Sequence, residues 1–139
     1  MDQLERLIIK DACQSISVQF GRLQDERRHD DLAGLMTADA CYVRLGEELA
    51  VDAFIEWIKT TPPNKTRHFV TPTVFSSIKE NLAKGVTYYA LYLYGGDEKT
   101  PYPLEGPFVV GEYHEEFART DSSWKIRRRE ARIIFRKQP

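Results

Sequence analysis

The sequence predicts an α+β fold in which helices come first and a curved, mainly antiparallel sheet follows. Up to Pro63 the apolar residues recur mostly at helical spacing. Beyond Pro63 the chain changes to β-branched and aromatic runs separated by short polar segments. These runs predict strands of about ten residues, and antiparallel strands of that length usually curl. We therefore expect a sheet that wraps around a helix or a cavity.

The first predicted helix spans residues 2–27 and is amphipathic. Its apolar stripe consists of Leu4, Ile8, Ala12, Ile16 and Phe20, widened by Ile9, Cys13 and Leu23. Asp2 is the expected N-cap, and Glu5, three residues later, completes the pattern of a capping box. This helix is the long element expected to pack on the sheet.

Two shorter helices and five strands follow. A short helix is predicted over residues 30–36 and a strand over residues 37–43. Asp52 is the expected N-cap of a third helix over residues 53–61, which Pro62 and Pro63 end. Four long strands then cover residues 67–78, 85–94, 108–120 and 124–135. No internal repeat or change in composition divides the chain, so one domain over residues 1–139 is expected.

The composition argues against several classes of function. The 20 basic and 21 acidic residues leave a net charge of −1, which gives no general attraction to nucleic acid or to acidic membranes. The basic run KIRRRE falls within a predicted strand, which argues further against nucleic-acid binding. We find no glycine-rich phosphate loop, no cluster at metal-ligand spacing and no nucleophile elbow, so neither a cofactor nor a metal is expected.

The two cysteines, Cys13 and Cys41, are too few for a disulfide framework or a zinc site. Buried free thiols suit a reducing cytoplasm. The first residues do not have the pattern of a signal peptide, and no segment approaches the roughly 20 apolar residues of a transmembrane helix. A cytoplasmic location is therefore expected.

Both faces of the predicted strand at residues 85–94 are apolar. One face carries Val86, Tyr88, Ala90, Tyr92 and Tyr94, and the other carries Thr87, Tyr89, Leu91 and Leu93. One face must meet the helices, and in a chain of this size a partner subunit is the expected cover for the other. A homo-oligomer, either a dimer or a trimer, is therefore expected.

Three stretches carry a resemblance to a known superfamily: FGRLQDERRHDDLAGLMTADACYV, TRHFVTPTVF and VVGEYHEEFARTDSSWKIRRREARIIF. They resemble the SnoaL-like group of the nuclear transport factor 2-like superfamily. That group includes scytalone dehydratase, bile-acid 7α-dehydratase, lindane dehydrochlorinase and the small subunits of ring-hydroxylating dioxygenases. The resemblance covers nearly the whole chain and implies a cone-shaped roll, in which one long and two shorter helices pack on a strongly curved mixed sheet and enclose a cavity. Because this fold hosts many activities, the resemblance identifies the architecture better than the reaction.

The resemblance also implies a catalytic dyad. Asp25 matches an aspartate near the end of the first helix in the lyases, and His68, where RHFV begins a strand, matches their catalytic histidine. In such a dyad the carboxylate fixes the imidazole tautomer while the other ring nitrogen takes a proton. On an ideal helix Asp25 points about 140° away from Phe20, so it enters the cavity only if the helix bends or ends there. The alternative is a solvated aspartate in the charged run LQDERRHDD.

Arg129 is a third candidate, because it stands five residues after Trp124, as an arginine does in the final strand of the dehydrochlorinase. It shares strand parity with Ala131, Ile133 and Phe135, which is compatible with an inward side chain. There it could bind a leaving anion or a substrate carboxylate. A structural ion pair with Glu115 or Glu112 on the preceding strand is the alternative.

Aromatic residues are the candidates for substrate contact. The lyases commonly carry a tyrosine five residues before the aspartate, but this chain has Phe20 there, which cannot donate a hydrogen bond. The candidates are Phe20, Tyr42, Phe54, Trp57, Tyr88 and Tyr113. Their structural alternative is packing in the core or in an interface.

Two functions are consistent with these observations. The first is a cofactor-independent lyase or isomerase that acts on a hydrophobic, ring-containing small molecule, with His68 as base and Asp25 as its partner. The second is a non-catalytic ligand-binding or assembly module similar to a dioxygenase small subunit, which would associate with a larger iron-containing protein. The missing hydroxyl at Phe20 favours the second.

Overall fold

A computed structural model describes residues 1–139 and confirms the α+β prediction. The helices are α1 (Gln3–Asp25), α2 (His29–Ala33) and α3 (Val51–Thr60). The strands are β1 (Met36–Arg44), β2 (Glu47–Ala50), β3 (Lys65–Val70), β4 (Val74–Ile78), β5 (Leu82–Tyr94), β6 (Val109–Thr120) and β7 (Ser123–Arg136). No helix is long and apolar enough to cross a membrane.

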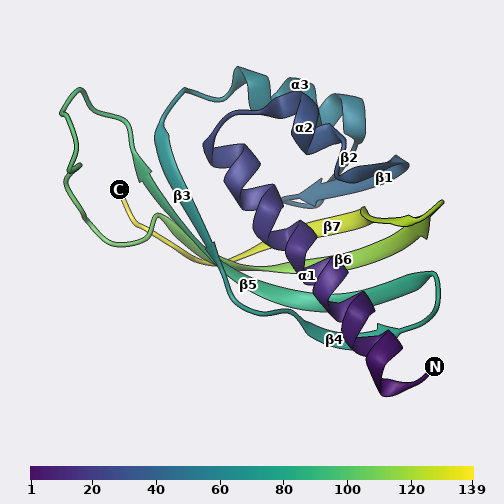
Figure 1. The fold of residues 1–139 in the computed structure, drawn as a ribbon. Coiled ribbons are helices and arrows are strands. Elements are labelled where there is room, and N and C mark those ends of the chain that lie inside the picture. Colours follow the sequence, from purple (N-terminus) through teal and green to yellow (C-terminus); the bar gives the residue numbers. More distant parts are fainter.

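All seven strands form one curved, unclosed sheet in the order β2-β1-β7-β6-β5-β3, and β4 pairs with the first part of β5. Only the β1–β7 pair is parallel. In Figure 1, α1 crosses the concave side of the sheet, and α2 and α3 lie over the end that carries β1 and β2. The expected arrangement of a long helix and two short ones on a curved, mainly antiparallel sheet is confirmed.

Helix α1 begins with the predicted capping box. The backbone N–H of Glu5 donates to Asp2 at 2.8 Å, and the backbone N–H of Asp2 donates to the Glu5 carboxylate at 3.1 Å. Only part of the predicted apolar stripe is buried, because Leu4 and Ile8 are 66% and 59% exposed. The first turns of α1 project past the sheet edge at β4, so contact with the sheet begins further along the helix (Figure 1).

The hydrophobic core lies between α1, α3 and the concave face of the sheet. Its fully buried apolar side chains are Cys13, Phe20, Leu32, Phe54, Ala83, Phe117 and Ile126. Burial, together with the negative charge of Glu115, raises the pKa of the Cys13 thiol to about 12. Cys13 is therefore a core residue, and both Cys13 and the half-buried Cys41 are free thiols.

Some expected boundaries are wrong. Pro72 has no backbone N–H to donate to a ladder, and the expected strand over residues 67–78 divides around it into β3 and β4. Asp52 does not cap α3, since the N-cap is Ala50 and no side chain bonds there. The short strand β2 was not anticipated. It pairs with β1 through a two-residue turn in which Leu45 and Gly46 both have positive φ, as tight hairpins require.

Candidate active site

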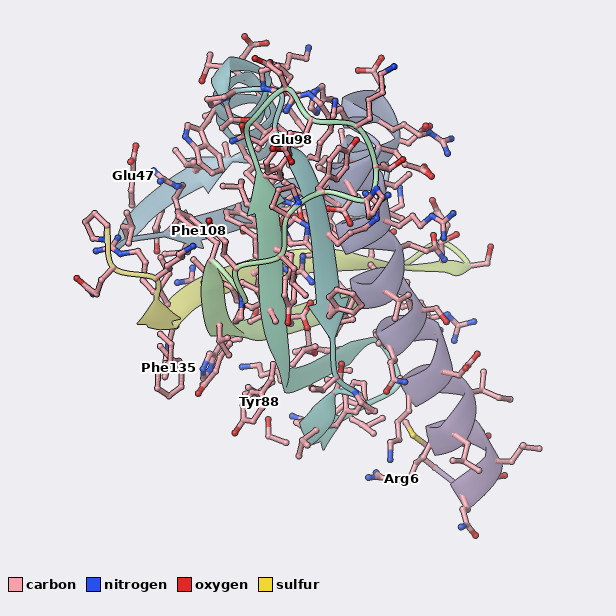
Figure 2. The ribbon with its side chains drawn as sticks, turned by 90° about the vertical axis from the view of Figure 1, so that its left-hand side faces the viewer. Arg6, Glu47, Tyr88, Glu98, Phe108 and Phe135 are labelled. Atoms are coloured by element: carbon pink, nitrogen blue, oxygen red, sulfur yellow. The ribbon has the colours of Figure 1, made fainter.

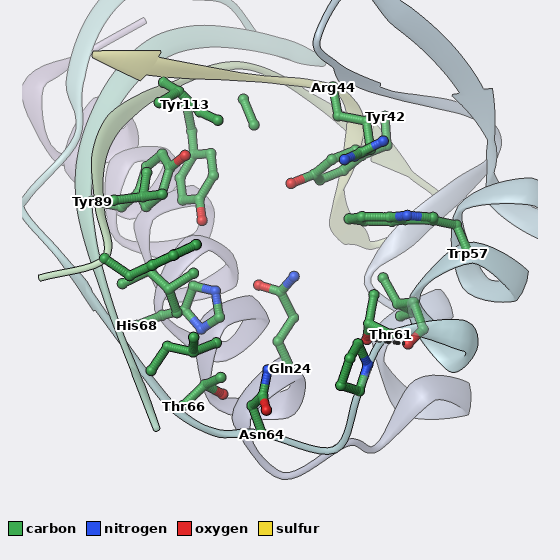
Figure 3. A pocket seen from close by; sticks show the side chains of 18 of the residues that line it. Gln24, Tyr42, Arg44, Trp57, Thr61, Asn64, Thr66, His68, Tyr89 and Tyr113 are labelled. Atoms are coloured by element: carbon green, nitrogen blue, oxygen red, sulfur yellow. Dashed lines mark hydrogen bonds between the residues drawn. The ribbon is translucent and has the colours of Figure 1, made fainter. Parts of the chain in front are cut away.

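A cavity of about 360 Å³ lies between the concave face of the sheet and the helices. Its wall is mainly apolar, and its polar groups come from the C-terminal end of α1, from α2, from the segment between α3 and β3, and from β1, β3, β5 and β6 (Figure 3). A concave, mostly apolar pocket with a few convergent polar groups is typical of a small-molecule site.

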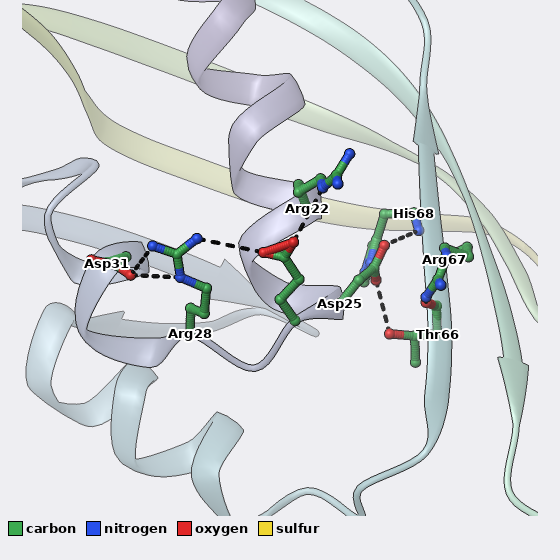
Figure 4. Close-up of polar contacts among 8 residues, drawn as sticks. Arg22, Asp25, Arg28, Asp31, Thr66, Arg67 and His68 are labelled. Carbon is green, nitrogen blue, oxygen red and sulfur yellow. Dashed lines mark hydrogen bonds and ion pairs between the residues drawn. The ribbon is translucent and has the colours of Figure 1, made fainter.

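Asp25 and His68 are in direct contact beside this cavity (Figure 4). Nδ1 of His68 lies 2.6 Å from Oδ1 of Asp25, and the backbone N–H of His68 donates to Oδ2 at 3.0 Å. The Thr66 hydroxyl also donates to Oδ1, at 2.8 Å. Both side chains of the dyad are only 10% exposed, so these hydrogen bonds are largely shielded from water.

The end of α1 places Asp25 at this point. The N–H of Arg28 bonds the carbonyl of Leu23, and the N–H of Arg27 bonds that of Gln24, both at 3.0 Å. With Arg27 at a φ of 54°, these bonds form a Schellman motif. The helix therefore ends immediately after Asp25, which lets the carboxylate turn toward β3 and away from solvent.

Helix α1 can approach β3 closely because residue 21 has no side chain. A Cβ added at Gly21 would lie 3.0 Å from the Cβ of His68. In β3 the side chains alternate, so that Thr66, His68 and Val70 are half-buried while Arg67 and Phe69 are exposed. The absence of a side chain at Gly21 and the inward orientation of His68 in β3 together allow Asp25 and His68 to make contact.

The environment of Asp25 keeps it ionised. Burial alone acts to raise the pKa of this carboxyl, but hydrogen bonds from the side chain and backbone of His68, the charge of His68 and the Thr66 hydroxyl lower it further than burial raises it. The net pKa lies below the ordinary value of an aspartate. A charged Asp25 fixes the tautomer of His68 with the proton on Nδ1 and leaves Nε2 able to accept one. Nε2 has no protein partner, and the imidazole faces the cavity (Figure 3).

Three tyrosines add phenol groups to the same cavity. Tyr42, Tyr89 and Tyr113 all line it, and none of their hydroxyls makes a hydrogen bond within the protein. The rings of Tyr89 and Tyr113 stack at 4.0 Å with an interplanar angle of 6°. Desolvation raises the pKa of all three, that of Tyr89 to about 12 and that of Tyr113 well above its usual value. They therefore stay neutral and remain available as hydrogen-bond donors.

Arg129 lies behind the cavity wall and pairs with Glu115. The two side chains are 1% and 0% exposed, and Nε of Arg129 donates to Glu115 at 3.2 Å. The guanidinium lies 4.3 Å from the ring centre of Phe20 and 3.7 Å from that of Tyr113, and its two terminal nitrogens have no hydrogen-bond partner. Of the two expected arrangements, the structure has the ion pair with Glu115. The hydroxyls of Ser17 and Thr87 also donate to this carboxylate.

Comparison with known families identifies the chain. The SnoaL-like domain matches residues 5–130, which is most of the sequence. The protein belongs to the SnoaL-like family. No curated protein sequence matches the chain significantly.

Solved structures share the fold of this SnoaL-like domain at low sequence identity. A scytalone dehydratase-like protein from Novosphingobium aromaticivorans has a TM-score of 0.81 and 19% identity, covering 99% of this chain and 92% of its own. The hexachlorocyclohexane dehydrochlorinase LinA-type3 from Novosphingobium barchaimii has a TM-score of 0.77 and 18% identity, and the match covers 98% of this chain and 93% of the dehydrochlorinase. The beta subunit of an aromatic-ring-hydroxylating dioxygenase-like protein from Novosphingobium aromaticivorans has a TM-score of 0.76 and 13% identity, and the match covers 96% of this chain and 94% of the subunit. At these identities the similarity shows the fold alone.

The SnoaL-like domain places the expected aromatic residues in three different settings. Tyr42, Trp57 and Tyr113 line the cavity, whereas Phe20 and Phe54 are fully buried beneath it and support the lining rings. The expectation for Tyr88 is wrong, because its side chain is 58% exposed on the outer face of the sheet. Figure 2 shows it projecting away from the helices.

Tyr89 takes the place in the cavity that was expected of Tyr88. A Cβ at Gly111, the cross-strand partner of Tyr89, would lie 2.7 Å from the Tyr89 ring, so a glycine there makes room for it. The isolated glycine in VVGEYH was the sequence signal for this close approach. No group of three or more His, Cys, Asp or Glu side chains could hold a metal ion in the SnoaL-like domain.

Proposed function

We propose that this protein is a cofactor-independent lyase or isomerase that removes a proton from carbon in a hydrophobic, ring-containing small molecule. The observation that carries the proposal is the contact of 2.6 Å between His68 and Asp25 at the wall of an apolar cavity. Nε2 of His68 takes the proton, and Asp25 stabilises the imidazolium that forms. A buried, ionised partner makes this charge separation less costly than it would be for an isolated histidine.

The tyrosine hydroxyls supply the second part of the reaction. Removal of a proton leaves an electron pair on the substrate, and an adjacent carbonyl oxygen that takes up this charge is stabilised by phenol donors. Tyr42, Tyr89 and Tyr113 offer such donors, which compensates for the missing hydroxyl at Phe20. A leaving group on the neighbouring carbon then departs with its bonding electrons and receives the proton from the imidazolium, or the proton returns to a different carbon. The first outcome is a lyase reaction and the second an isomerisation.

Proton abstraction is testable before the natural substrate is known. A panel of cyclic ketones and ring-containing β-hydroxy ketones is incubated with the protein in deuterium oxide, and loss of the C–H signal is followed by proton NMR. We expect catalysed exchange or elimination for part of the panel, and its loss in both His68→Ala and Asp25→Asn. A folded His68→Ala variant with unchanged exchange contradicts the mechanism.

The chain offers a matched control for these variants. His114 and Glu112 form a second histidine–carboxylate pair, with an N–O distance of 2.9 Å, and neither residue lines the cavity. His114→Ala and Glu112→Gln therefore remove the same chemical groups without altering the proposed site. Both should keep full exchange activity.

A non-catalytic assembly module is the second candidate function. Phe20 and the shared fold with a dioxygenase beta subunit favour it. Such a module would co-purify with a larger iron-containing protein, whereas the lyase would be active alone. Purification from the native source, followed by iron analysis and mass spectrometry of associated chains, separates the two.

Self-association through the outer face of the sheet is part of the proposal. The register aligns Phe69, Ala90, Val110 and Phe135 in one row across four strands. Phe69 and Phe135 are 60% and 68% exposed, which is unusual for phenylalanine in a monomeric protein. Covering this row would remove apolar surface from water in the homo-oligomer expected from the sequence.

A further inference from the structure

Arg44 is a cation without an anionic partner at the wall of the cavity. It stands at the end of β1, lines the pocket and makes no ion pair or hydrogen bond within the protein. Its guanidinium carbon lies 4.1 Å from the ring centre of Trp57, which holds the group by a cation–π contact. Its cross-strand neighbour Glu47 does not pair with it. The hydrogen-bonding capacity of Arg44 is therefore unused.

The arginines and carboxylates nearest the cavity are divided, because only arginines belong to its lining. Arg27 and Arg44 both line it, and no aspartate or glutamate does. Arg27 donates to the backbone carbonyls of Thr61 and Pro62, which fixes its side chain without neutralising its charge. His29, also in the lining, has a lowered pKa because burial and the positive charges of Arg27 and Lys59 all disfavour its protonated form. An anion at the Arg44 wall therefore meets positive charge, while the carboxylate beside the cavity, Asp25, is bonded to His68 and is not part of the lining.

Arg44 and the dyad lie on different walls. Arg44, Tyr42 and Trp57 form one side of the pocket, and Tyr89 and His68 form the opposite side (Figure 3). A molecule that spans the cavity can thus place one end against Arg44 and another carbon near Nε2 of His68. Apolar side chains, including Leu91, Val109 and Ala131, line the space around such a ligand.

We propose that Arg44 binds the anionic group of an amphipathic organic acid, a carboxylate or sulfonate attached to a hydrophobic ring system. The planar guanidinium matches two oxygens of such a group, and stacking on Trp57 orients it before the ligand arrives. The anion is bound at the Arg44 wall, and the ring system fills the apolar space. This inference rests on the proposed function only for the proton abstraction that His68 would carry out on the bound ligand. Binding of the anion itself requires no catalysis.

Two fluorescent probes of nearly the same shape test this assignment. 8-Anilinonaphthalene-1-sulfonate carries one negative charge, and N-phenyl-1-naphthylamine is the same scaffold without the sulfonate. We expect Arg44→Gln to weaken binding of the sulfonate by about five- to tenfold, the range for losing a hydrogen-bonded charge at a partly exposed site. Binding of the neutral probe should stay within twofold. Equal effects on both probes, or no effect on either, overturn the proposal.

Three further variants make the result specific. Arg6→Gln removes the same charge from an exposed position outside the pocket and should leave both affinities unchanged. Arg44→Lys keeps the charge but not the planar stack, and should retain part of the preference for the sulfonate. Leu91→Trp fills part of the cavity and should weaken the binding of both probes. Unchanged binding in a folded Leu91→Trp variant means that the probes bind elsewhere, and the assignment is then wrong.

The dyad variants separate this inference from the proposed reaction. His68→Ala and Asp25→Asn should keep the preference for the charged probe, since neither residue contacts the anion at Arg44. If wild type and both dyad variants prefer the sulfonate probe but no proton exchange is ever catalysed, the proposed reaction is wrong and the anion site stands. If exchange is catalysed and Arg44→Gln changes neither probe, the reaction stands and the anion site is wrong.

Discussion

Gly21 of helix α1 lies directly against His68 of strand β3. A Cβ at position 21 would be 3.0 Å from the Cβ of His68, which is closer than most contacts that a Cβ atom makes in proteins. The contact between Asp25 and His68, four residues further along the helix, depends on this close packing. The geometry of the dyad therefore depends partly on the absence of a Cβ atom at position 21.

Gly21→Ala should impair the dyad more than it impairs stability. Alanine in a helix interior is intrinsically better than glycine by about 0.5–1 kcal/mol, which offsets part of the steric cost. We expect the melting temperature to change little while the 15N and 1H NMR signals of the His68 ring shift, because its hydrogen bond to Asp25 is displaced. Gln19→Ala, at an exposed position of the same helix, is the control and should leave these signals in place. Unchanged His68 signals in Gly21→Ala contradict the close packing.

The ionised form of Asp25 should stabilise the fold in a defined pH range. Its pKa in the folded protein is below the unfolded value of about 3.9, so the stabilisation is complete above that value and is lost as the pH falls through the folded pKa. Asp25→Asn should therefore lower the free energy of unfolding by about 1–3 kcal/mol at pH 7, and the difference from wild type should shrink below about pH 4. Urea unfolding at several pH values measures it.

An exposed aspartate is the control for this pH series. Asp31 pairs with Arg28 at the surface, where both side chains are more than half exposed. Asp31→Asn should change stability by well under 1 kcal/mol at any pH, because exposed ion pairs contribute little. A constant difference between wild type and Asp25→Asn from pH 7 to pH 3 would show that the charge of Asp25 is not what stabilises the fold.

The architecture could be predicted from the sequence because the spacing of the apolar residues changes so clearly at Pro63. The resemblance predicted Asp25 and His68 as a candidate dyad, but their separation of 43 residues in the sequence carries no information about their distance in space. The feature that brings Asp25 into contact with His68 is the end of α1. There the left-handed position of the Schellman motif is occupied by Arg27 and not by the glycine that normally marks such an end, so the local sequence could not locate it.

The prediction that Tyr88 contacts the substrate was wrong for a different reason. Both faces of β5 are apolar, so alternation alone could not decide which face meets the cavity. The inward face is fixed by polar contacts: Thr87 donates to Glu115, which also accepts hydrogen bonds from Ser17 and Arg129. These partners come from three other elements, so only the folded chain brings them together. Arg44 was likewise missed, because its pairing with Trp57 links β1 to α3.

Arg129 and Glu115 should behave as one buried unit in stability measurements. Removing one partner leaves the other charge buried and uncompensated, so Arg129→Met should destabilise the protein by about 3–5 kcal/mol. Glu115→Gln keeps groups that can bond Ser17 and Thr87. The double variant should therefore lose less than the sum of the two single losses, by about 1 kcal/mol or more. Urea unfolding of all four proteins provides the cycle, and strictly additive losses would contradict the coupling.

The outer apolar row gives a direct test of self-association. Phe135→Glu places a charge at one end of the row proposed to be covered, and burying an unpaired charge is costly. We expect sedimentation velocity to show a dimer or trimer for wild type and a monomer for Phe135→Glu, with both folded by circular dichroism. Lys99→Glu adds the same carboxylate in the exposed loop before β6 and should leave the sedimentation coefficient unchanged. A wild-type protein that sediments as a monomer at all concentrations contradicts the proposed self-association.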